Sequence, residues 1–412
     1  MTKQSRFFKE EVRLLRRFSP RNDIDWRKKL ELKILISPDK FKGCLTAEES
    51  ARLMAVGVRR ALPKTSIRIL PVADGGEGTA DILYGALGGR RRRTRVHDPL
   101  GRPIRAEWTW FPKTRIALLE LAQASGLWRL NPLERNPLRT STYGTGELIK
   151  AVLKSKPKTL WIAVGGSATV DGGAGLLQGL GSRLVLKGGR VLNRPARGND
   201  LEEIERIDLS GLAEVPPITV LCDVNNPLLG DRGAARVFGP QKGASPTAVR
   251  RLERGLRRWA AVLKKATGKN VLGLSRMGAA GGAAAGIWTV LGGRFVSGAD
   301  AVLDAVGFDL AAKESDLVLT GEGAVDRTTM EGKAVGRVIE RSRRPRAPVI
   351  VLAGRVEGNL DRRDGVTFKE ISSGLSTKES MKRTQKLLPE AARRAVEEFF
   401  ISQKGSRLRR RG

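Results

Sequence analysis

Short apolar runs rich in Ile, Val and Leu recur along the chain, and each run ends abruptly in a polar turn. The six runs span residues 33–37, 67–72, 159–164, 218–222, 316–320 and 348–353. They are apolar at nearly every position, which is typical of strands buried on both faces of a parallel sheet. The pattern therefore predicts six buried parallel strands.

Helical patterns follow several of these turns. A capping-box sequence at 46–49 opens an amphipathic helix that we expect to end near Ala61. A second helix is predicted from the Ser-Pro start at 245 to the glycine at 268, and a third over 146–154. Strands and helices that alternate in this way indicate a doubly wound α/β architecture.

The turns after the strands are acidic and rich in glycine, although the chain carries a formal net charge of +33. The segments 72–81, 163–175, 221–227 and 316–326 total 41 residues with eight acids and no Lys or Arg. Ligands of such sheets bind outside the carboxyl ends of the strands. Glycine turns admit phosphates, and Mg²⁺ can lie between phosphates and carboxylates. The turns therefore indicate a Mg-nucleotide or a hydroxylated substrate, and phosphoryl transfer as the chemistry.

Other chemistries have little material in this chain. His97 is its only histidine, so Ser-His-Asp triads and histidine metal clusters have almost nothing to be built from. No GxxxxGK[ST] phosphate loop occurs, and neither GTGEL at 144–148 nor GEGAVD at 321–326 completes a GxGxxG motif.

The positive charge raises a second hypothesis, binding to nucleic acid. Arginine runs recur at 90–93, 250–258 and 341–346 and could neutralise phosphates. They lack the interleaved aromatic residues that stack on bases, and carboxylates in the strand-end turns would repel phosphodiesters. A solvated basic surface is the favoured interpretation.

The remaining composition places few constraints on location. With two cysteines, Cys44 and Cys222, the chain has no disulfide framework, so we expect a reducing cytoplasm. The apolar segment 278–293 is rich in Gly and Ala and predicts a buried helix rather than a membrane span. Residues 1–31 form a basic N-terminal extension, interpreted either as an organelle transit peptide or as a frayed extension, and 404–412 form a basic tail.

Nine motifs, in order between Lys33 and Phe400, resemble the bacterial-type glycerate kinase family. The motifs are SPDKFKG (37–43), PVADGGEGT (71–79), DPLGRP (98–103), NPLRTSTYGTGELI (136–149), GGSATVDGGAGLLQGLG (165–181), CDVNNPLLGDRGAARVFGPQKGA (222–244), GAAGG (278–282), LTGEGAVDRTTMEGKA (319–334) and VIVLAG (349–354). The resemblance implies an ATP- and Mg²⁺-dependent kinase that phosphorylates D-glycerate to a phosphoglycerate. The sequence leaves 2- and 3-phosphoglycerate open as products, and 2-phosphoglycerate is slightly favoured.

The resemblance also implies two α/β domains. One is a flavodoxin-like, doubly wound domain built from both chain ends, 32–95 and 285–403, and the other is an inserted central α/β domain, 96–284. The active site would lie in the cleft between them, and the partners would be the small molecules D-glycerate and ATP. A homodimer is left open, and neither a membrane nor a nucleic acid is expected as a partner.

Candidate site residues follow from the matched motifs. We expect Asp39 or Asp171 nearest the glycerate hydroxyl, with Lys42 neutralising phosphate oxygens. The substrate-binding candidates in the same turns are Asp74, Gly75, Gly76, Glu77, Arg139, Ser167, Asp223 and Lys333. The nucleotide candidates are Lys242, Gly321, Glu322, Gly323 and Asp326, and Asp74 and Asp223 are also candidates for holding Mg²⁺.

The chain departs from the family pattern at a few of these motifs. Lys40 and Cys44 stand where relatives usually have serine, and Val170 stands where they usually have asparagine. Ala324, Arg327 and Glu331 alter the motif that begins GEG. A kinase for another small hydroxy acid therefore remains an alternative at this stage.

Overall fold

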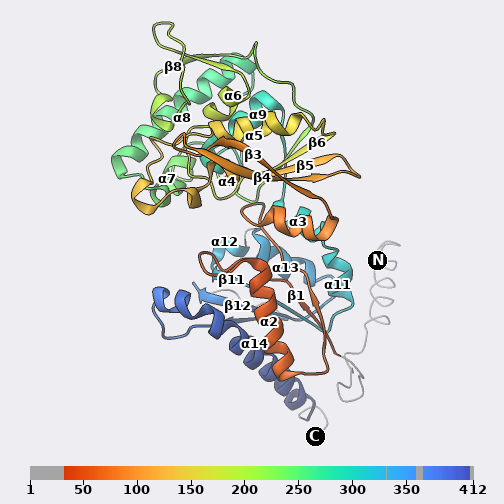
Figure 1. Ribbon diagram of the computed structural model, residues 1–412. Helices are drawn as coiled ribbons and strands as arrows, with labels where there is room; N and C mark the ends of the chain where they lie inside the picture. Colours follow the sequence, from red (N-terminus) through yellow and green to blue (C-terminus); the bar gives the residue numbers. More distant parts are fainter. Residues whose placement is uncertain (1–31, 331, 359–364, 409–412) are drawn as a thin grey trace, which may run out of the picture.

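The computed structural model describes residues 32–330, 332–358 and 365–408. The predicted N-terminal extension 1–31 and the end of the predicted tail, 409–412, lie outside the described residues. Two bodies, each built around its own large sheet, lie end to end (Figure 1). No helix among the described residues is long and apolar enough to cross a membrane.

The first sheet has five parallel strands. They are β1 (Lys33–Ile36), β2 (Ser66–Ile69), β11 (Leu317–Val325), β12 (Val349–Val356) and β13 (Val366–Glu370). Their spatial order is β2-β1-β11-β12-β13, with Ile34 beside Leu317 in register. Counted along the chain, this is the order 2-1-3-4-5 of flavodoxin-like sheets. The expected flavodoxin-like topology is therefore present.

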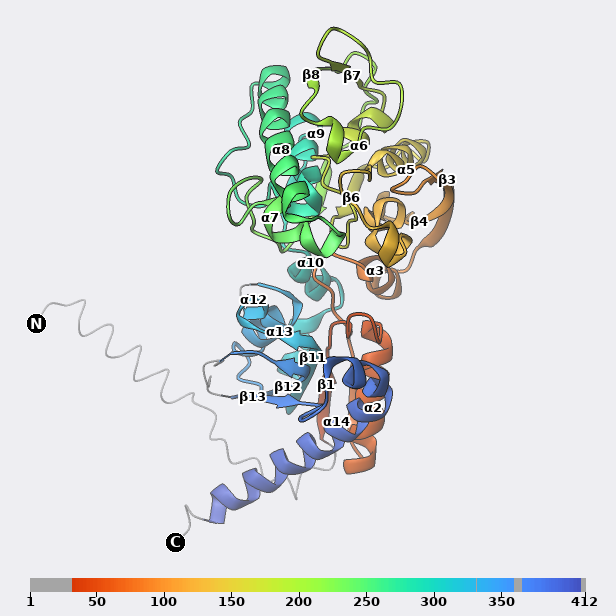
Figure 2. The ribbon, with the colours of Figure 1, turned by 90° about the vertical axis from the view of Figure 1, so that its left-hand side faces the viewer.

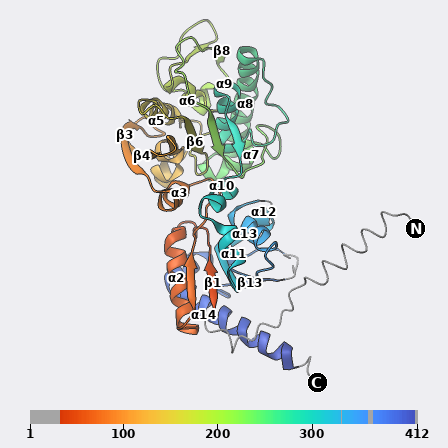
Figure 3. The same cartoon turned by 90° about the vertical axis from the view of Figure 1, so that its right-hand side faces the viewer.

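Helices cover both faces of this sheet. On one face α2 (Ala47–Ala61) packs beside α14 (Thr377–Leu408), with Gly57 close to Pro389 (Figure 3). The opposite face is covered by α10 (Gly298–Ala305), α11 (Phe308–Lys313) and α13 (Ala334–Ser342), with the short α12 (Arg327–Met330) before α13. The predicted capping box of α2 is formed, because Thr46 and Glu49 bond each other's backbone N–H.

The second sheet has six strands in the order β10-β9-β6-β5-β4-β3. They are β3 (Arg90–His97), β4 (Pro103–Phe111), β5 (Ile116–Glu120), β6 (Thr159–Ala163), β9 (Ile218–Leu221) and β10 (Arg294–Val296). The pairs β3–β4 and β4–β5 are antiparallel. The pairs β5–β6, β6–β9 and β9–β10 are parallel. A hairpin of β7 (Arg183–Leu186) and β8 (Ile204–Asp208) forms a separate ribbon.

Helices pack around the six-stranded sheet over one large apolar core. They are α4 (Ala122–Ser125), α5 (Tyr143–Leu153), α6 (Ala174–Gly179), α7 (Ala234–Phe238), α8 (Pro246–Thr267) and α9 (Ala283–Leu291). The predictions for α5 and α8 are confirmed, including the Ser245 and Gly268 caps of α8. The segment 278–293 is a short 3₁₀ turn followed by α9, and most of its side chains are buried as predicted.

The chain changes sheets at other positions than the predicted boundaries. A boundary at 95/96 would cut β3, and a boundary at 284/285 would cut α9, whose residues belong to the core of the six-stranded sheet. The arginine run 90–93 did not look like a buried strand because β3 is an edge strand with exposed side chains. We propose that the inserted part begins near residue 89 and ends near 297.

Two helices lie where the chain crosses between the two sheets. These are α3 (Thr79–Leu87), which follows β2, and α10, which follows β10. Both lie between the two bodies (Figure 2). Their side chains join a core that includes Leu83 of α3, Val302 of α10, and Leu118 and Leu221 of the six-stranded sheet. The two bodies are therefore connected by packed helices.

Candidate functional site

The strands β1 and β11 bring two predicted residues together at the carboxyl end of the five-stranded sheet. The Asp39 N–H donates to the Gly321 carbonyl over 2.9 Å, and the Thr320 hydroxyl donates to the Ser37 carbonyl over 2.7 Å. This is the point where the strand order reverses, at which ligands of doubly wound sheets bind. Asp39 and Glu322 are thus placed at the same sheet edge.

A lysine lies between two carboxylates at this edge. The Lys40 Nζ is 3.8 Å from Asp39 Oδ1 and 3.6 Å from Asp74 Oδ1. Burial, with a smaller contribution from Asp74, raises the pKa of Asp39 to about 7, although Lys40 opposes the shift. Burial alone would lower the pKa of Lys40, but Asp39, Asp74 and Glu77 together hold it above its usual value. At neutral pH the site holds a fixed cation and a carboxyl group able to exchange a proton.

Glu322 adds a second buried acid to this edge. Its Oε1 is buried without a hydrogen-bond partner, and burial followed by the charge of Asp39 raises its pKa to about 8. Asp326 is directed elsewhere, because its Oδ1 accepts the N–H of Thr329 at the start of α12. Lys333 is the N-cap residue of α13, and its Nζ lies 4.0 Å from Asp326 Oδ1.

A cavity of about 380 Å³ opens beside Asp39 and Lys40. Lys42 and Glu77 line it from the five-stranded body, and Glu120, Gln123 and Trp128 line it from the six-stranded body. Both bodies therefore contribute to one cavity. Its size suits a small organic molecule.

The predicted glycine turn at 75–76 lies at the contact between the two bodies. A Cβ on Gly165 would lie 2.4 Å from the Gly76 Cα, and a Cβ on Gly75 would lie 2.9 Å from the Leu221 carbonyl. The missing side chains let the two bodies approach at the backbone. Gly321 likewise lies against the Leu352 carbonyl of β12, while Gly323 faces the Lys42 backbone. These close approaches are between protein segments, and the expected approach of the glycine turns to a ligand stays a prediction.

Carboxylates of the six-stranded sheet hold the two crossing helices. At the end of β5, Glu120 accepts the N–H groups of Gly78 and Ala80 at 3.0 and 2.9 Å. After β9, Asp223 accepts those of Gly298 and Ala299 at 3.0 and 2.8 Å. Burial raises the pKa of Glu120 to about 7 and that of Asp223 to about 6. Each carboxylate thus occupies the first turn of a helix, where negative charge is stabilising.

Asp171 does not lie where its predicted role requires. Its side chain is fully buried and accepts hydrogen bonds from the Thr142 N–H and hydroxyl, both at 2.7 Å, and from the Gly173 and Gly175 N–H groups. Burial raises its pKa despite these four bonds. The geometry supports a structural carboxylate that joins the starts of α5 and α6, rather than a group that meets a hydroxyl of a substrate.

Three further predicted residues lie within the six-stranded body. The Lys242 Nζ is buried and donates to the Ser167 hydroxyl and the Thr169 carbonyl, each at 2.8 Å. Burial lowers the pKa of Lys242 to about 7 despite the nearby Asp171. Arg139 is exposed in the loop before α5. The printed contacts of Lys242 and Ser167 are with each other and with the backbone of the six-stranded body.

Sequence reasoning missed Lys40 and Glu120 as members of the site. Lys40 was noted only as a departure from the family, although its place beside Asp39 was a usable signal. Glu120 ends a strand that the apolar runs did not reveal. Among the described residues, no group of three or more His, Cys, Asp or Glu side chains is arranged to hold a metal ion.

Comparisons with known proteins agree on one family. The family model described as the glycerate kinase family matches residues 34–400. A glycerate kinase of Halalkalibacterium halodurans is 39% identical over 87% of this chain and 96% of its own length. A glycerate 2-kinase of Escherichia coli is 40% identical over 80% of this chain and 88% of its own.

A solved structure is also similar. A crystal structure from Salmonella typhimurium LT2, described as a "putative glycerate kinase 2", superposes with a TM-score of 0.71 at 36% identity. It covers 91% of this chain and 100% of its own.

Proposed function

The chain belongs to the glycerate kinase family and is an ATP-dependent glycerate kinase, and from this premise we propose that glycerate meets the γ-phosphoryl group of ATP in the cavity beside Asp39. The observation that carries the proposal is the buried Asp39 carboxyl, which lines this cavity with Lys40 next to it. Its pKa of about 7 suits a group that must take up a proton near neutral pH.

The reaction then needs one proton acceptor and correct positioning. A glycerate hydroxyl oxygen attacks the γ-phosphorus, the new P–O bond forms, and the bond to the β-phosphate oxygen breaks to release ADP. Asp39 accepts the hydroxyl proton. The Lys40 ammonium, at the same end of the sheet, stabilises the negative charge of the reacting groups. Phosphoryl transfer needs positioning and charge stabilisation more than strong base catalysis.

The ATP phosphates would lie toward α13. Its N-terminus carries Lys333, and the N-terminus of a helix together with a lysine favours phosphate oxygens. Lys42, which lines the cavity, is available on the other side. This arrangement replaces the predicted role of Lys242, whose ammonium is held inside the six-stranded body.

The predicted Mg²⁺ pair, Asp74 and Asp223, does not fit a protein-held metal site. Both oxygens of Asp223 accept N–H groups of α10, and Asp74 is paired with Lys40. We propose that Mg²⁺ arrives with ATP, where it supplies charge neutralisation of the phosphates. Glu77, which lines the cavity, is a candidate for a contact with it.

We propose D-glycerate as the substrate and 2-phosphoglycerate as the product. The support is the relative from Escherichia coli, which is named a glycerate 2-kinase and is 40% identical over most of both chains.

The experiment that tests the site compares Asp39→Asn with Asp81→Asn. Asp81 also lines the cavity, but its carboxylate is exposed and pairs with Arg91. In an ADP-release assay with D-glycerate, Asp39→Asn should lower kcat by about 100-fold or more, as expected for loss of a general base. Asp81→Asn should stay within about threefold of the parent enzyme, a range too small to reflect a lost general base. Equal activity of the two variants would contradict the assignment, and NMR of the product distinguishes 2- from 3-phosphoglycerate.

A further inference from the structure

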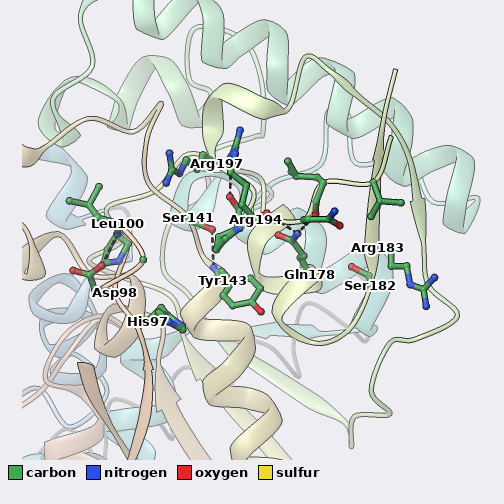
Figure 4. Close-up of a pocket in the computed structure, with 16 residues that line it drawn as sticks. His97, Asp98, Leu100, Ser141, Tyr143, Gln178, Ser182, Arg183, Arg194 and Arg197 are labelled. Carbon is green, nitrogen blue, oxygen red and sulfur yellow. Dashed lines mark hydrogen bonds between the residues drawn. The ribbon is translucent and has the colours of Figure 1, made fainter. Parts of the chain in front are cut away.

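A second, larger cavity lies within the six-stranded body. It has a volume of about 890 Å³ and is bounded by the β3–β4 turn, the starts of α5 and β7, α6 and the loop 191–197 (Figure 4). No residue that lines it also lines the cavity beside Asp39. The glycerate kinase reaction proposed above makes no use of it.

The walls of this second cavity are held in place by side chains. Gln178 of α6 donates to the Leu192 and Arg194 carbonyls at 2.8 and 2.9 Å, and it accepts the Ala196 N–H at 2.8 Å. Arg194 forms two bonds of 2.7 Å to Asp200. The loop is therefore built before any ligand arrives, which lowers the entropy cost of binding.

The opposite wall is fixed in a similar way. Asp98 Oδ1 accepts the N–H groups of Leu100 and Arg102 at 2.8 and 2.9 Å, and its Oδ2 accepts the Arg102 Nε at 2.6 Å. Asp98 is buried, and its ion pair with Arg102 neutralises its charge. It contributes little negative potential to the cavity.

Two arginines at the cavity lack such a carboxylate partner. Arg194 is neutralised by Asp200, and His97 contacts Glu147, but Arg183 and Arg197 form no ion pair within 4 Å among the described residues. The charge of Arg183 also acts on Asp208, its neighbour across the β7–β8 pair, so Arg197 is the less neutralised of the two. Figure 4 shows them on opposite sides of Gln178. The cavity therefore has an excess of positive charge, and guanidinium groups bind carboxylates and phosphates in two-bond geometry.

A buried hydroxyl gives independent support for a ligand. Ser182 lines the cavity, is only 4% exposed, and its Oγ is buried without a hydrogen-bond partner. Leaving a buried polar group unpaired costs about 1–3 kcal/mol. An oxygen acceptor on a bound molecule would remove that cost after a rotation of the Ser182 side chain that brings its Oγ to the cavity surface.

From these observations we propose that this cavity is a second ligand site, which binds a small organic anion carrying a phosphate or carboxylate group. Arg183 and Arg197 would bind the anionic groups, and Ser182 would donate to an oxygen of the same molecule. The site would be separate from the kinase cavity and is not a catalytic site.

Isothermal titration without ATP tests the proposal with four probes. Citrate represents carboxylates, inorganic phosphate represents the phosphate group alone, and 2- and 3-phosphoglycerate carry both groups. The probe that binds most tightly shows whether the site recognises a carboxylate, a phosphate or both groups together. Arg183→Ala and Arg197→Ala should each weaken its binding by about tenfold or more, as expected for charge-assisted hydrogen bonds. Arg190→Ala is the matched control, since Arg190 is exposed on the same hairpin and does not line the cavity.

A charge reversal at the rim guards against loss of folding. Val191 lines the cavity and is 39% exposed, so Val191→Glu adds a negative charge without disturbing the core. This variant should also weaken binding, while kcat and KM for glycerate stay unchanged in all of these variants. The proposal is overturned if no probe binds, if binding is unaffected in the two arginine variants, or if kcat falls together with binding.

Discussion

Gly76 and Gly165 hold the two bodies in direct backbone contact, because a Cβ on Gly165 would lie 2.4 Å from the Gly76 Cα. Gly76 belongs to the turn after β2, and Gly165 follows β6 of the other sheet. No flexible side chain could yield at this contact. The distance between the bodies, and with it the width of the cavity beside Asp39, therefore depends on the absence of a methyl group.

Gly165→Ala should separate the two bodies. We expect kcat to fall by about tenfold or more, since displacing catalytic groups by about 1 Å can cost 100-fold. Overpacking should also lower the free energy of unfolding by about 1–3 kcal/mol. Gly85→Ala is the control, because a Cβ there meets nothing within 4 Å and should stabilise α3 by about 0.5–1 kcal/mol. Parent-like turnover in Gly165→Ala would show that the contact does not set the cavity.

The pH dependence of the reaction should report Asp39. The carboxyl must be ionised to accept a proton, and its pKa is raised to about 7, so kcat/KM should rise with pH through about 7 and then level off. Asp39→Asn should abolish this limb of the profile. Initial rates from a stopped assay, with ADP detected by a method that does not depend on pH, give the pH profile of kcat/KM. A profile that is flat between pH 6 and 8 in the parent enzyme would exclude Asp39 as the base.

Lys40→Ser should create a divalent metal site. Without the ammonium, Asp39 and Asp74 face each other without a cation, and carboxylates in this arrangement bind Mg²⁺ or Mn²⁺. We expect electron paramagnetic resonance to detect one bound Mn²⁺ in the nucleotide-free variant and none in the parent. Lys42→Ser, which removes an exposed lysine three residues after Asp39, should behave like the parent. Equal Mn²⁺ binding by the parent and Lys40→Ser would mean that the ammonium excludes no metal.

Glu322→Gln should stabilise the protein in a pH-dependent way. The pKa of Glu322 is about 8 in the fold and 4.5 ordinarily, so the folded state holds the proton more tightly. The stability of the parent should fall as the pH rises from about 4.5 to about 8, and that loss should be absent from the variant. The gain at pH 9 should be on the order of a few kcal/mol. Urea unfolding at pH 5 and pH 9 measures it, with the exposed Glu48→Gln as control. A gain that is equal at both pH values would contradict the raised pKa.

Much of the fold was accessible from apolar patterning. All six apolar runs are strands, but the prediction that all six are buried is wrong for β2, which is an exposed edge strand. The caps at Thr46 and Ser245 begin helices where predicted. The strands β3 and β4 were missed because neither is a continuous apolar run: β3 is exposed and basic, and β4 alternates. The strand β5, IALLE, is a short buried apolar run that was overlooked. The antiparallel pairing of these strands is also a long-range property that local pattern does not specify.

The site was predictable to the level of its turns but not of its side chains. Asp39, Asp74 and Glu322 do meet at one sheet edge, as strand ends in a parallel sheet must. Asp171, Asp223 and Lys242 lie in equally acidic or basic motifs. Their charged groups, however, form hydrogen bonds with backbone N–H or carbonyl groups. Whether a carboxylate faces a cavity or a helix terminus depends on the rotation of one side chain, which spacing in the sequence does not encode.

The pairing of β1 with β11 also has a consequence for how the enzyme is made. Ser37 and Thr320 bond each other across 283 positions of the chain, so β1 leaves the ribosome long before its neighbour exists. The six-stranded body, contained almost entirely between these two strands, can form its core first. The five-stranded sheet can close only when synthesis is nearly complete. Asp39 and Glu322 therefore meet late, and a nascent chain that stops before β11 carries no assembled kinase site.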